Sequence, residues 1–255
     1  MARMLVVVAH PDDETFGTGS CIAYAAASGV DVTVCCATRG EAGEDTSGTT
    51  SSPDELARVR EAELRAAAQI LGAGEVVVLD FGDSDMEGDP APGSLMAAPI
   101  GEIVAAVAPV IARVQPDVVV TLDPDSVVDH RDHVRIGQAT KHAFAEAAQP
   151  HARLYHWTLV RSVMGRWLQE MHAQGLLQAY DADLILGRPD DEITTVVDVS
   201  SVIETRRAGI AAHYTQMSPF HGLEPEFQAA ILSADHFVRA VPEWNGGPQE
   251  TSLWG

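Results

Sequence analysis

The sequence is short of positive charge. Against 37 aspartates and glutamates it has 16 lysines and arginines, and Lys141 is its single lysine. The formal net charge of −21 creates a field that repels nucleic acid and anionic membrane surfaces. We therefore expect a small-molecule substrate and no nucleic-acid partner.

Cysteine and long apolar runs are scarce as well. Cys21, Cys35 and Cys36 lie among apolar residues, and adjacent residues of a strand point to opposite faces, so we expect buried, reduced thiols. The apolar stretch over residues 4–9 is too short for the core of a signal peptide, and no other run approaches the length of a membrane span. These absences predict a cytoplasmic protein without membrane insertion.

The 255 residues, 46% of them apolar and 21% charged, are typical of a globular chain with one good-sized core. Short apolar runs alternate with longer segments of helical period, which indicates βαβ units. The predicted fold is α/β, a Rossmann-like, mostly parallel sheet flanked by helices in a single domain. We expect its core over residues 4–215, and a C-terminal lid or extension over 216–255 that contains "SPFHGLEP" and "DHFVRAVPEW".

The same patterns predict individual elements. Strands are expected over residues 4–9, 31–37, 75–79, 116–122, 153–160 and 194–199. Helices are expected over residues 17–28, 53–71, 100–114, 132–148 and 201–214. The helix over 53–71 has the clearest ends, with Ser52 as N-cap, Pro53 at the first position and Gly72 beyond the last. Residues 80–99, rich in Asp, Gly and Pro, are expected to form a surface loop.

The motif "AHPDDE", residues 9–14, follows the first predicted strand directly. His10 therefore lies at the carboxyl edge of the sheet, where open parallel sheets bind ligands. His10 and Asp13 can converge on one metal ion, and Asp12 between them is then free to accept a proton from water. An alternative is that Asp12, Asp13 and Glu14 cap the following helix and complement its dipole.

A second motif, "DHRDH" at residues 129–133, also follows a buried strand and so reaches the same edge. His10, Asp13 and one of its two histidines would complete a zinc site with an open position for water. The other histidine could act as general acid or stabilise an oxyanion, with Asp132 fixing its tautomer. The alternative is a solvated helix start, but two matching half-sites favour the metal site.

Together these motifs resemble the LmbE/PIG-L superfamily of zinc-dependent de-N-acetylases, some of which act on N-acetylglucosaminyl groups. "TRGEAG" at 38–43 is similar to the family's loop after the second strand, and "REAELRAAAQILG" at 60–72 to its arginine-led helix. The resemblance covers residues 5–140, with weaker support to "HYTQM" at 213–217.

The resemblance implies zinc, or another divalent ion such as Fe²⁺, on three ligands: His10, Asp13 and His133. It implies Asp12 as general base, and His130 as the group that stabilises the oxyanion and protonates the leaving amine. Asp132 would orient His130, and Arg60 and Asp83 would contact the substrate. The implied reaction is hydrolysis of an amide, with removal of an acyl group, expected to be acetyl, from the nitrogen of an N-acetylglucosaminyl-type or related secondary-metabolite substrate.

Two departures from the family pattern stand out. Arg131 replaces a proline in the second motif, which should leave the ligands intact but alter the rim of the site. Val128 stands where some glycoside-processing relatives have a mobile tyrosine. The substrate of those relatives therefore does not transfer directly to this chain.

Other readings remain open at this point. Some relatives hydrate an unsaturated dicarboxylate, which would need arginines near the metal, and Arg39, Arg131 and Arg135 are candidates. "GTGS" at 17–20 vaguely resembles a phosphate loop of a nucleotide-binding module, but it lacks the G-x-G-x-x-G spacing. A serine or cysteine hydrolase has no supporting motif.

Acidic loop residues could hold sugar hydroxyls or an amine product, or could simply be solvated surface. They are Asp80, Asp83, Asp85, Glu87, Asp123, Asp125 and Asp129. Assembly into a homo-oligomer is possible on the resemblance alone, and no feature of the sequence gives its size.

Overall fold

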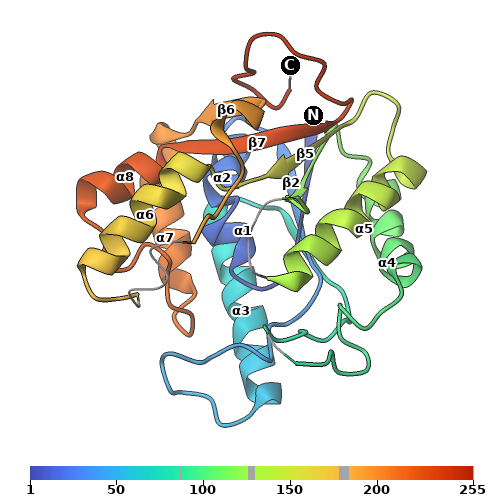
Figure 1. Ribbon diagram of the computed structural model, residues 1–255. Coiled ribbons are helices and arrows are strands. Elements are labelled where there is room, and N and C mark those ends of the chain that lie inside the picture. The colour runs from blue at the N-terminus through green and yellow to red at the C-terminus, as the bar shows by residue number, and fades with distance from the viewer. Residues whose placement is uncertain (87, 126–129, 178–183, 255) are drawn as a thin grey trace.

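The computed structural model describes residues 1–86, 88–125, 130–177 and 184–254 (Figure 1). Its strands form one seven-stranded sheet in the order β3-β2-β1-β4-β5-β7-β6. They are β1 (Arg3–Val8), β2 (Asp31–Cys36), β3 (Glu75–Val78), β4 (Val118–Leu122), β5 (Arg153–Trp157), β6 (Thr195–Asp198) and β7 (Ala234–Val241). Strands β1 to β5 pair in parallel, whereas β7 runs antiparallel to both β5 and β6.

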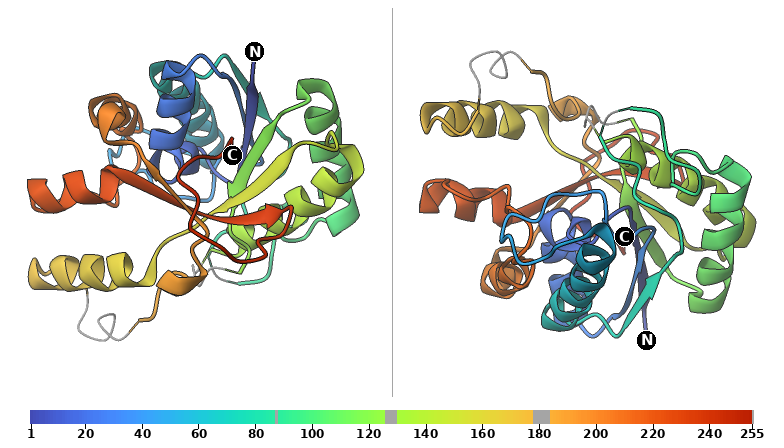
Figure 2. Two further views of the ribbon diagram at one scale, coloured as in Figure 1. Left: turned by 90° about the horizontal axis from the view of Figure 1, so that it is seen from above. Right: turned by 90° about the horizontal axis from the view of Figure 1, so that it is seen from below.

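Helices cover both faces of this sheet (Figures 1 and 2). The described α-helices are α1 (Asp13–Phe16), α2 (Gly19–Ala27), α3 (Pro53–Leu71), α4 (Ile100–Val114), α5 (Arg131–Ala147), α6 (Arg161–Ala173), α7 (Ile203–Ala212) and α8 (Pro225–Leu232). Short 3₁₀ turns are η2 (Asp190–Glu192) and η3 (Ser200–Val202). Helices α2, α3 and α7 lie on one face and α4 and α5 on the other, which confirms the predicted α/β fold in a single domain.

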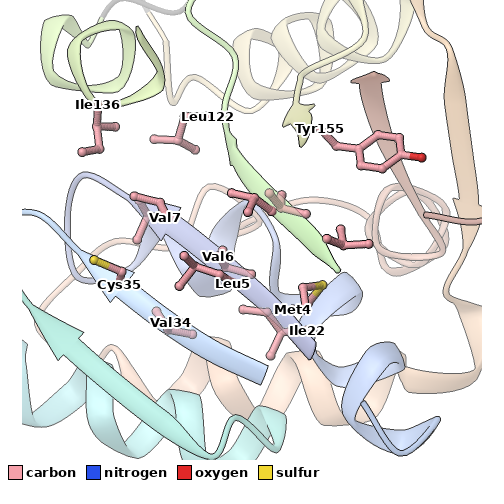
Figure 3. Packing of buried hydrophobic residues seen from close by; sticks show 14 of the residues in the cluster. Met4, Leu5, Val6, Val7, Ile22, Val34, Cys35, Leu122, Ile136 and Tyr155 are labelled. Carbon is pink, nitrogen blue, oxygen red and sulfur yellow. The ribbon is translucent and has the colours of Figure 1, made fainter. Parts of the chain in front are cut away.

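The core is centred on β1, which lies between β2 and β4 (Figure 3). Met4, Leu5 and the three following valines are completely buried. A strand buried on both faces has no solvent side, so its sequence is a continuous apolar run rather than an alternating one. Cys21, Cys35 and Cys36 are buried in this core as free thiols, as predicted.

The chain direction of the parallel strands defines the functional edge. From β1 the chain proceeds outward to β2 and β3, then returns to β4 on the other side of β1. The carboxyl ends of β1 and β4 therefore flank the point at which the strand order reverses. In doubly wound sheets this point leaves a crevice for ligands.

Helix α3 agrees with its prediction residue by residue. The Ser52 side chain accepts the Glu55 backbone N–H, Pro53 occupies the first turn, and Gly72 ends the helix with φ of 88°. The loop over the described part of 80–99 and the helix over 100–114 are also confirmed.

The first predicted helix, over 17–28, is present as α2, and the short helix α1, which was not predicted, precedes it. The chain leaves α1 at Gly17, where a Cβ atom would lie 2.7 Å from the carbonyl oxygen of Asp13. This close contact with the backbone requires a glycine at position 17, so the first glycine of "GTGS" is explained by packing and not by a phosphate loop.

The C-terminal segment also differs from its prediction. Residues 234–241 form β7, which is inserted between β5 and β6, so "DHFVRAVPEW" is part of the sheet and not of a lid. Helices α6 and α8 were not predicted, and they project side by side beyond the sheet (Figure 2). Within the described residues, no helix is both long and apolar enough to cross a bilayer.

Candidate active site

The two histidine motifs meet at the reversal point of the sheet. His10 follows β1, and His130 caps the N-terminus of α5 after β4. The ring centroids of His10 and His130 are 4.3 Å apart, and those of His130 and His133 are 4.9 Å apart. The imidazoles of His10, His130 and His133 offer nitrogens within the spacing of metal ligands.

Asp13 lies between two of these imidazoles. Its Oδ1 is 3.0 Å from His133 Nε2, and its Oδ2 is 3.5 Å from His10 Nδ1. Burial by itself raises the pKa of Asp13, but the charge of His133 and the hydrogen bonds from both rings bring it well below its ordinary value. Two nitrogens and one carboxylate thus converge from two separate motifs, a donor set suited to Zn²⁺ or a similar ion.

The far nitrogen of His10 faces two further carboxylates. His10 Nε2 is 3.3 Å from Asp132 Oδ2 and 3.4 Å from Asp83 Oδ1. Burial by itself lowers the pKa of His10, but its hydrogen bonds with three carboxylates raise that pKa well above its ordinary value. Carboxylates on the far nitrogen of a ligating histidine fix its tautomer and orientation.

Asp132 corrects one sequence-based assignment. Its carboxylate is completely buried and accepts the Ser84 backbone N–H on Oδ2, the oxygen that faces His10. The other oxygen, Oδ1, has no hydrogen-bond partner among the described residues. The Asp132 side chain therefore orients His10 rather than His130.

His130 is held by the backbone instead. Its Nδ1 accepts the backbone N–H of Asp132 at 3.3 Å, so a neutral ring carries its proton on Nε2. Burial, together with the charges of His10 and His133, lowers the pKa of His130 to about 4. The ring is therefore a neutral hydrogen-bond donor near pH 7.

Asp12 is held in an unusual backbone conformation, with φ of 137° and ψ of −31°. A non-glycine residue in this region is strained, and such strain gathers at functional sites. Its carboxylate accepts a hydrogen bond from Arg60 Nη2 at 2.9 Å and is 18% exposed. Burial raises its pKa to about 6, although the Arg60 charge opposes the increase.

Arg60 is buried behind Asp12, not exposed to substrate. The guanidinium donates to the carbonyl oxygens of Gly40 and Pro11, each at 2.7 Å. A Cβ atom at Gly40 would lie 2.3 Å from this guanidinium, and one at Gly43 would lie 2.5 Å from it. The glycines of "TRGEAG" thus make room for Arg60, which positions Asp12 instead of the substrate contact predicted from the sequence.

A buried pair that the sequence did not reveal supports the same turn. Glu14 Oε1 is 2.7 Å from His213 Nε2, and Glu14 Oε2 accepts the backbone N–H of Asp12. Burial by itself lowers the pKa of His213, but the Glu14 charge raises it above its ordinary value. Glu14 therefore fixes the Asp12 backbone, and "HYTQM" supplies its partner.

The acidic loops are largely engaged by arginines. Both oxygens of Asp123 accept from Arg188, at 2.7 and 2.9 Å, and Asp125 also contacts that guanidinium. Asp80 contacts Arg39 at 3.2 Å. Glu87, Val128 and Asp129 lie outside the described residues.

A cavity of about 590 Å³ adjoins Asp13 and His133. Sequence reasoning missed this cavity because its walls come from distant segments. They include Trp157 at the end of β5, Trp167 on α6, Phe227 on α8 and a buried Arg206 on α7. The helical spacing of apolar residues in "VMGRWLQEM", over 163–171, is the signal from which α6 could have been predicted.

Comparison with known proteins identifies the family to which the chain belongs. Residues 5–144 match the PIG-L family, described as GlcNAc-PI de-N-acetylase. The chain belongs to the PIG-L family. A deacetylase from Rhodococcus erythropolis strain PR4, named 1D-myo-inositol 2-acetamido-2-deoxy-alpha-D-glucopyranoside deacetylase, is 34% identical over 273 residues, which span 94% of this chain and 91% of the relative.

Solved structures with a similar fold include a deacetylase and a hydratase. The N,N'-diacetylchitobiose deacetylase from Pyrococcus horikoshii has a TM-score of 0.63 at 19% identity, covering 93% of this chain and 83% of its own. The 4-carboxy-2-hydroxymuconate hydratase GalB from Pseudomonas putida KT2440 has a TM-score of 0.64 at 23% identity, covering 97% and 100%. At these identities the likeness concerns the fold alone.

The PIG-L assignment confirms the family resemblance inferred from the sequence. The relatives that are more than 30% identical over nearly the whole chain are named deacetylases, hydrolases of C–N bonds other than peptide bonds. This agrees with the enzyme class predicted from the two motifs.

Proposed function

We propose that the chain is a metal-dependent N-deacetylase in which a divalent ion, Zn²⁺ in the first place, is held by His10, Asp13 and His133. The observation that carries the proposal is the position of the Asp13 carboxylate between His10 Nδ1 and His133 Nε2. The neighbouring Asp12 carboxylate is held apart from them by a hydrogen bond from the Arg60 guanidinium. Asp83 and Asp132 add negative charge, and a cation offsets the cost of burying so many carboxylates together. The bound ion supplies a Lewis acid that polarises the scissile carbonyl and makes water more acidic.

Asp12 is the proposed general base. A base works best with a pKa near the working pH, and burial brings the pKa of Asp12 to about 6. Arg60 and the Glu14 contact to the Asp12 backbone fix the direction of its carboxylate. This rigid placement aims the carboxylate at the water that attacks the carbonyl carbon.

His130 is the proposed oxyanion partner. Its neutral ring, with Nδ1 occupied by the Asp132 backbone N–H, leaves Nε2–H to donate to the oxygen on which negative charge develops. The leaving amine then needs a proton, which either His130 or protonated Asp12 can deliver. When the attacked carbon re-forms its double bond to oxygen, the C–N bond breaks, and a carboxylate and a free amine are released.

The proposed substrate is an N-acylated glucosamine or a related amide, in line with the relatives' names. The rival hydration of a dicarboxylate needs unengaged arginines at the metal. Arg39 pairs with Glu61 and Asp80, and Arg135 donates to the Ala98 carbonyl. Arg131 donates to the carbonyl oxygens of residues 84, 85 and 88. These engagements favour amide hydrolysis.

The test is release of free amine from N-acetylglucosaminides by the purified, zinc-loaded protein, measured with an amine-reactive dye. We expect amine release that stops when a chelator removes the metal and resumes when zinc is returned. A hydratase would release no amine, so turnover of an unsaturated dicarboxylate without amine release would contradict the proposal.

A further inference from the structure

The cavity beside the proposed metal centre is lined mainly by apolar side chains. Those walls are Phe16, Leu122, Trp157, Val163, Met164, Trp167, Phe220, Phe227 and Ile231. Asp13 and His133 form part of the same lining, so the space is continuous with the site of reaction. Helices α6 and α8, which project side by side beyond the sheet, supply two of its walls (Figure 2).

Two of the charged groups in these walls, Arg206 and Asp123, pair with other charged side chains, and a third, Arg166, lies over the Phe227 ring, 4.2 Å from its centroid. Arg206 is 2% exposed, pairs with Asp235 at 3.2 Å, and donates to the carbonyl oxygens of Phe16 and Gly17. Asp123, which also lines the cavity, is held by Arg188 through both oxygens. The cavity therefore selects for apolar contact, because burying a polar group there without a partner costs free energy.

The other side of the centre is polar. Asp83, Asp132 and the Ser84 backbone surround His10 Nε2, and Glu41 accepts the backbone N–H of Asp83. The Asp83 and Asp132 carboxylates are buried and engaged with His10, so they are not free to contact a substrate. Hydroxyl groups of a sugar need hydrogen-bond partners, which the apolar walls of the cavity do not offer. The cavity therefore suits the less polar of the two substituents of the scissile amide.

We propose that the cavity holds the acyl group of the substrate, and that the enzyme accepts apolar acyl chains or rings larger than acetyl. The inference rests on the proposed deacylation. An acetyl methyl would leave most of a 590 Å³ cavity without contact, whereas cavities of this size enclose ligands of many atoms. The amine side of the substrate, with its hydroxyls, then lies outside the cavity.

The first test is kinetic, with a series of N-acyl glucosamines that carry acetyl, butanoyl, hexanoyl, octanoyl or phenylacetyl groups. Burial of each methylene gives about a fourfold gain, so kcat/KM should rise by about that factor per added CH₂ until the cavity is filled. A flat or falling series overturns the inference. A parallel series of N-acetylglucosaminides with methyl, butyl or octyl aglycones tests the other side, and a gain confined to that series also overturns it.

The second test uses Ala230→Phe, which puts an aromatic ring on a residue that lines the cavity. Ala229→Phe is the matched control, because Ala229 neighbours it on α8 but is outside the lining. We expect Ala230→Phe to reduce the octanoyl-to-acetyl ratio of kcat/KM at least tenfold, and Ala229→Phe to leave that ratio within twofold of wild type. Equal effects of the two variants would contradict the assignment.

A binding measurement separates this inference from the proposed function. Octanoate, the product of octanoyl hydrolysis, should change the fluorescence of Trp157 and Trp167 at concentrations where acetate does not, and Ala230→Phe should weaken this response. If no N-acyl sugar releases amine but octanoate binds in this way, the proposed function fails while the cavity assignment stands. If amine is released from N-acetyl substrates and octanoate binds no better than acetate, the cavity assignment fails alone.

Discussion

Two adjacent carboxylates of one motif have opposite pKa shifts. The pKa of Asp13 is lowered because two imidazoles face it, whereas the pKa of Asp12 is raised to about 6 because burial outweighs its single guanidinium. Groups whose environments separate their pKa values in this way commonly divide the roles of ligand and base. The sequence names both residues, but the placement of the Asp12 carboxylate depends on Arg60, 48 positions away.

His133→Ala tests the proposed ligand set at the residue scale. Loss of one of three protein ligands should lower zinc affinity by at least two orders of magnitude, whereas a merely solvated histidine would change nothing. The measurement is zinc content after dialysis against a weak chelator.

His142→Ala is the matched control for this experiment, because His142 is exposed on the same helix, α5. It should retain zinc as the wild type does. Equal zinc content in all three proteins would remove His133 from the ligand set.

At the scale of elements, a buried ion pair joins β7 to α7. Arg206 is completely surrounded and links Asp235 on β7 to the carbonyls that end α1. Such a pair is weak as net stabilisation, but removal of one partner leaves the other charge buried and unpaired. The contact therefore fixes how the C-terminal strand sits against the α1 turn.

Arg206→Met should destabilise the protein by about 3–5 kcal/mol, because it leaves the Asp235 carboxylate without its cation. Urea unfolding followed by circular dichroism gives this difference. The double variant Arg206→Met/Asp235→Leu should recover most of the loss, since it removes the orphaned charge. A single variant within about 0.5 kcal/mol of wild type would contradict the argument.

The Asp123–Arg188 pair, between the loop after β4 and the segment before η2, predicts a dependence of stability on pH. Burial by itself raises the pKa of Asp123, but its hydrogen bonds from Arg188 bring it below the ordinary value. The folded state then binds fewer protons than the unfolded state, so the contribution is full above about pH 4 and is lost as the pH falls further.

Thermal unfolding of wild type and Asp123→Asn at several pH values between 3 and 6 measures this contribution. The two melting temperatures should differ most near pH 6 and converge toward pH 3. A difference that grows on acidification would reverse the sign of the linkage. Asp31→Asn, at an exposed position that begins β2, serves as a neutral control.

Elements with local signals were predictable and elements without them were not. Helix α3 has its N-cap, its proline and its terminal glycine within the segment itself, so the sequence fixes both ends. Strand β7 has Asp, His and Arg among its residues and gains stability from pairing with β5 and β6. Such long-range pairing leaves little trace in the local pattern.

For the whole molecule, the net charge of −21 is a source of self-repulsion in the compact state. Raising sodium chloride from 0.1 to 1 M shortens the screening length from about 10 to 3 Å. We predict an increase of about 2–4 °C in melting temperature, which corresponds to ~1 kcal/mol for a chain of this size. A decrease would mean that surface ion pairs outweigh the repulsion.

The candidate site as a whole was predictable only in part. Both motifs follow buried strands, so their meeting at one edge of the sheet follows from the parallel topology. The contacts that support the motifs do not follow from this topology. Glu14 and His213 are 199 positions apart, and helices α6 and α8 contribute walls of the cavity. Those contacts arise from tertiary packing, which a single sequence does not encode locally.

The division of labour between Asp13 and Asp12 is the centre of this account, and Asp12→Asn tests it most directly. Zinc content and the rate of amine release from an N-acetylglucosaminide are measured on the same zinc-loaded preparation. The amide keeps the shape of the carboxylate but accepts no proton from water, so we predict wild-type zinc content with turnover reduced at least a thousandfold. Near-normal turnover with zinc retained would contradict the assignment of Asp12 as the base.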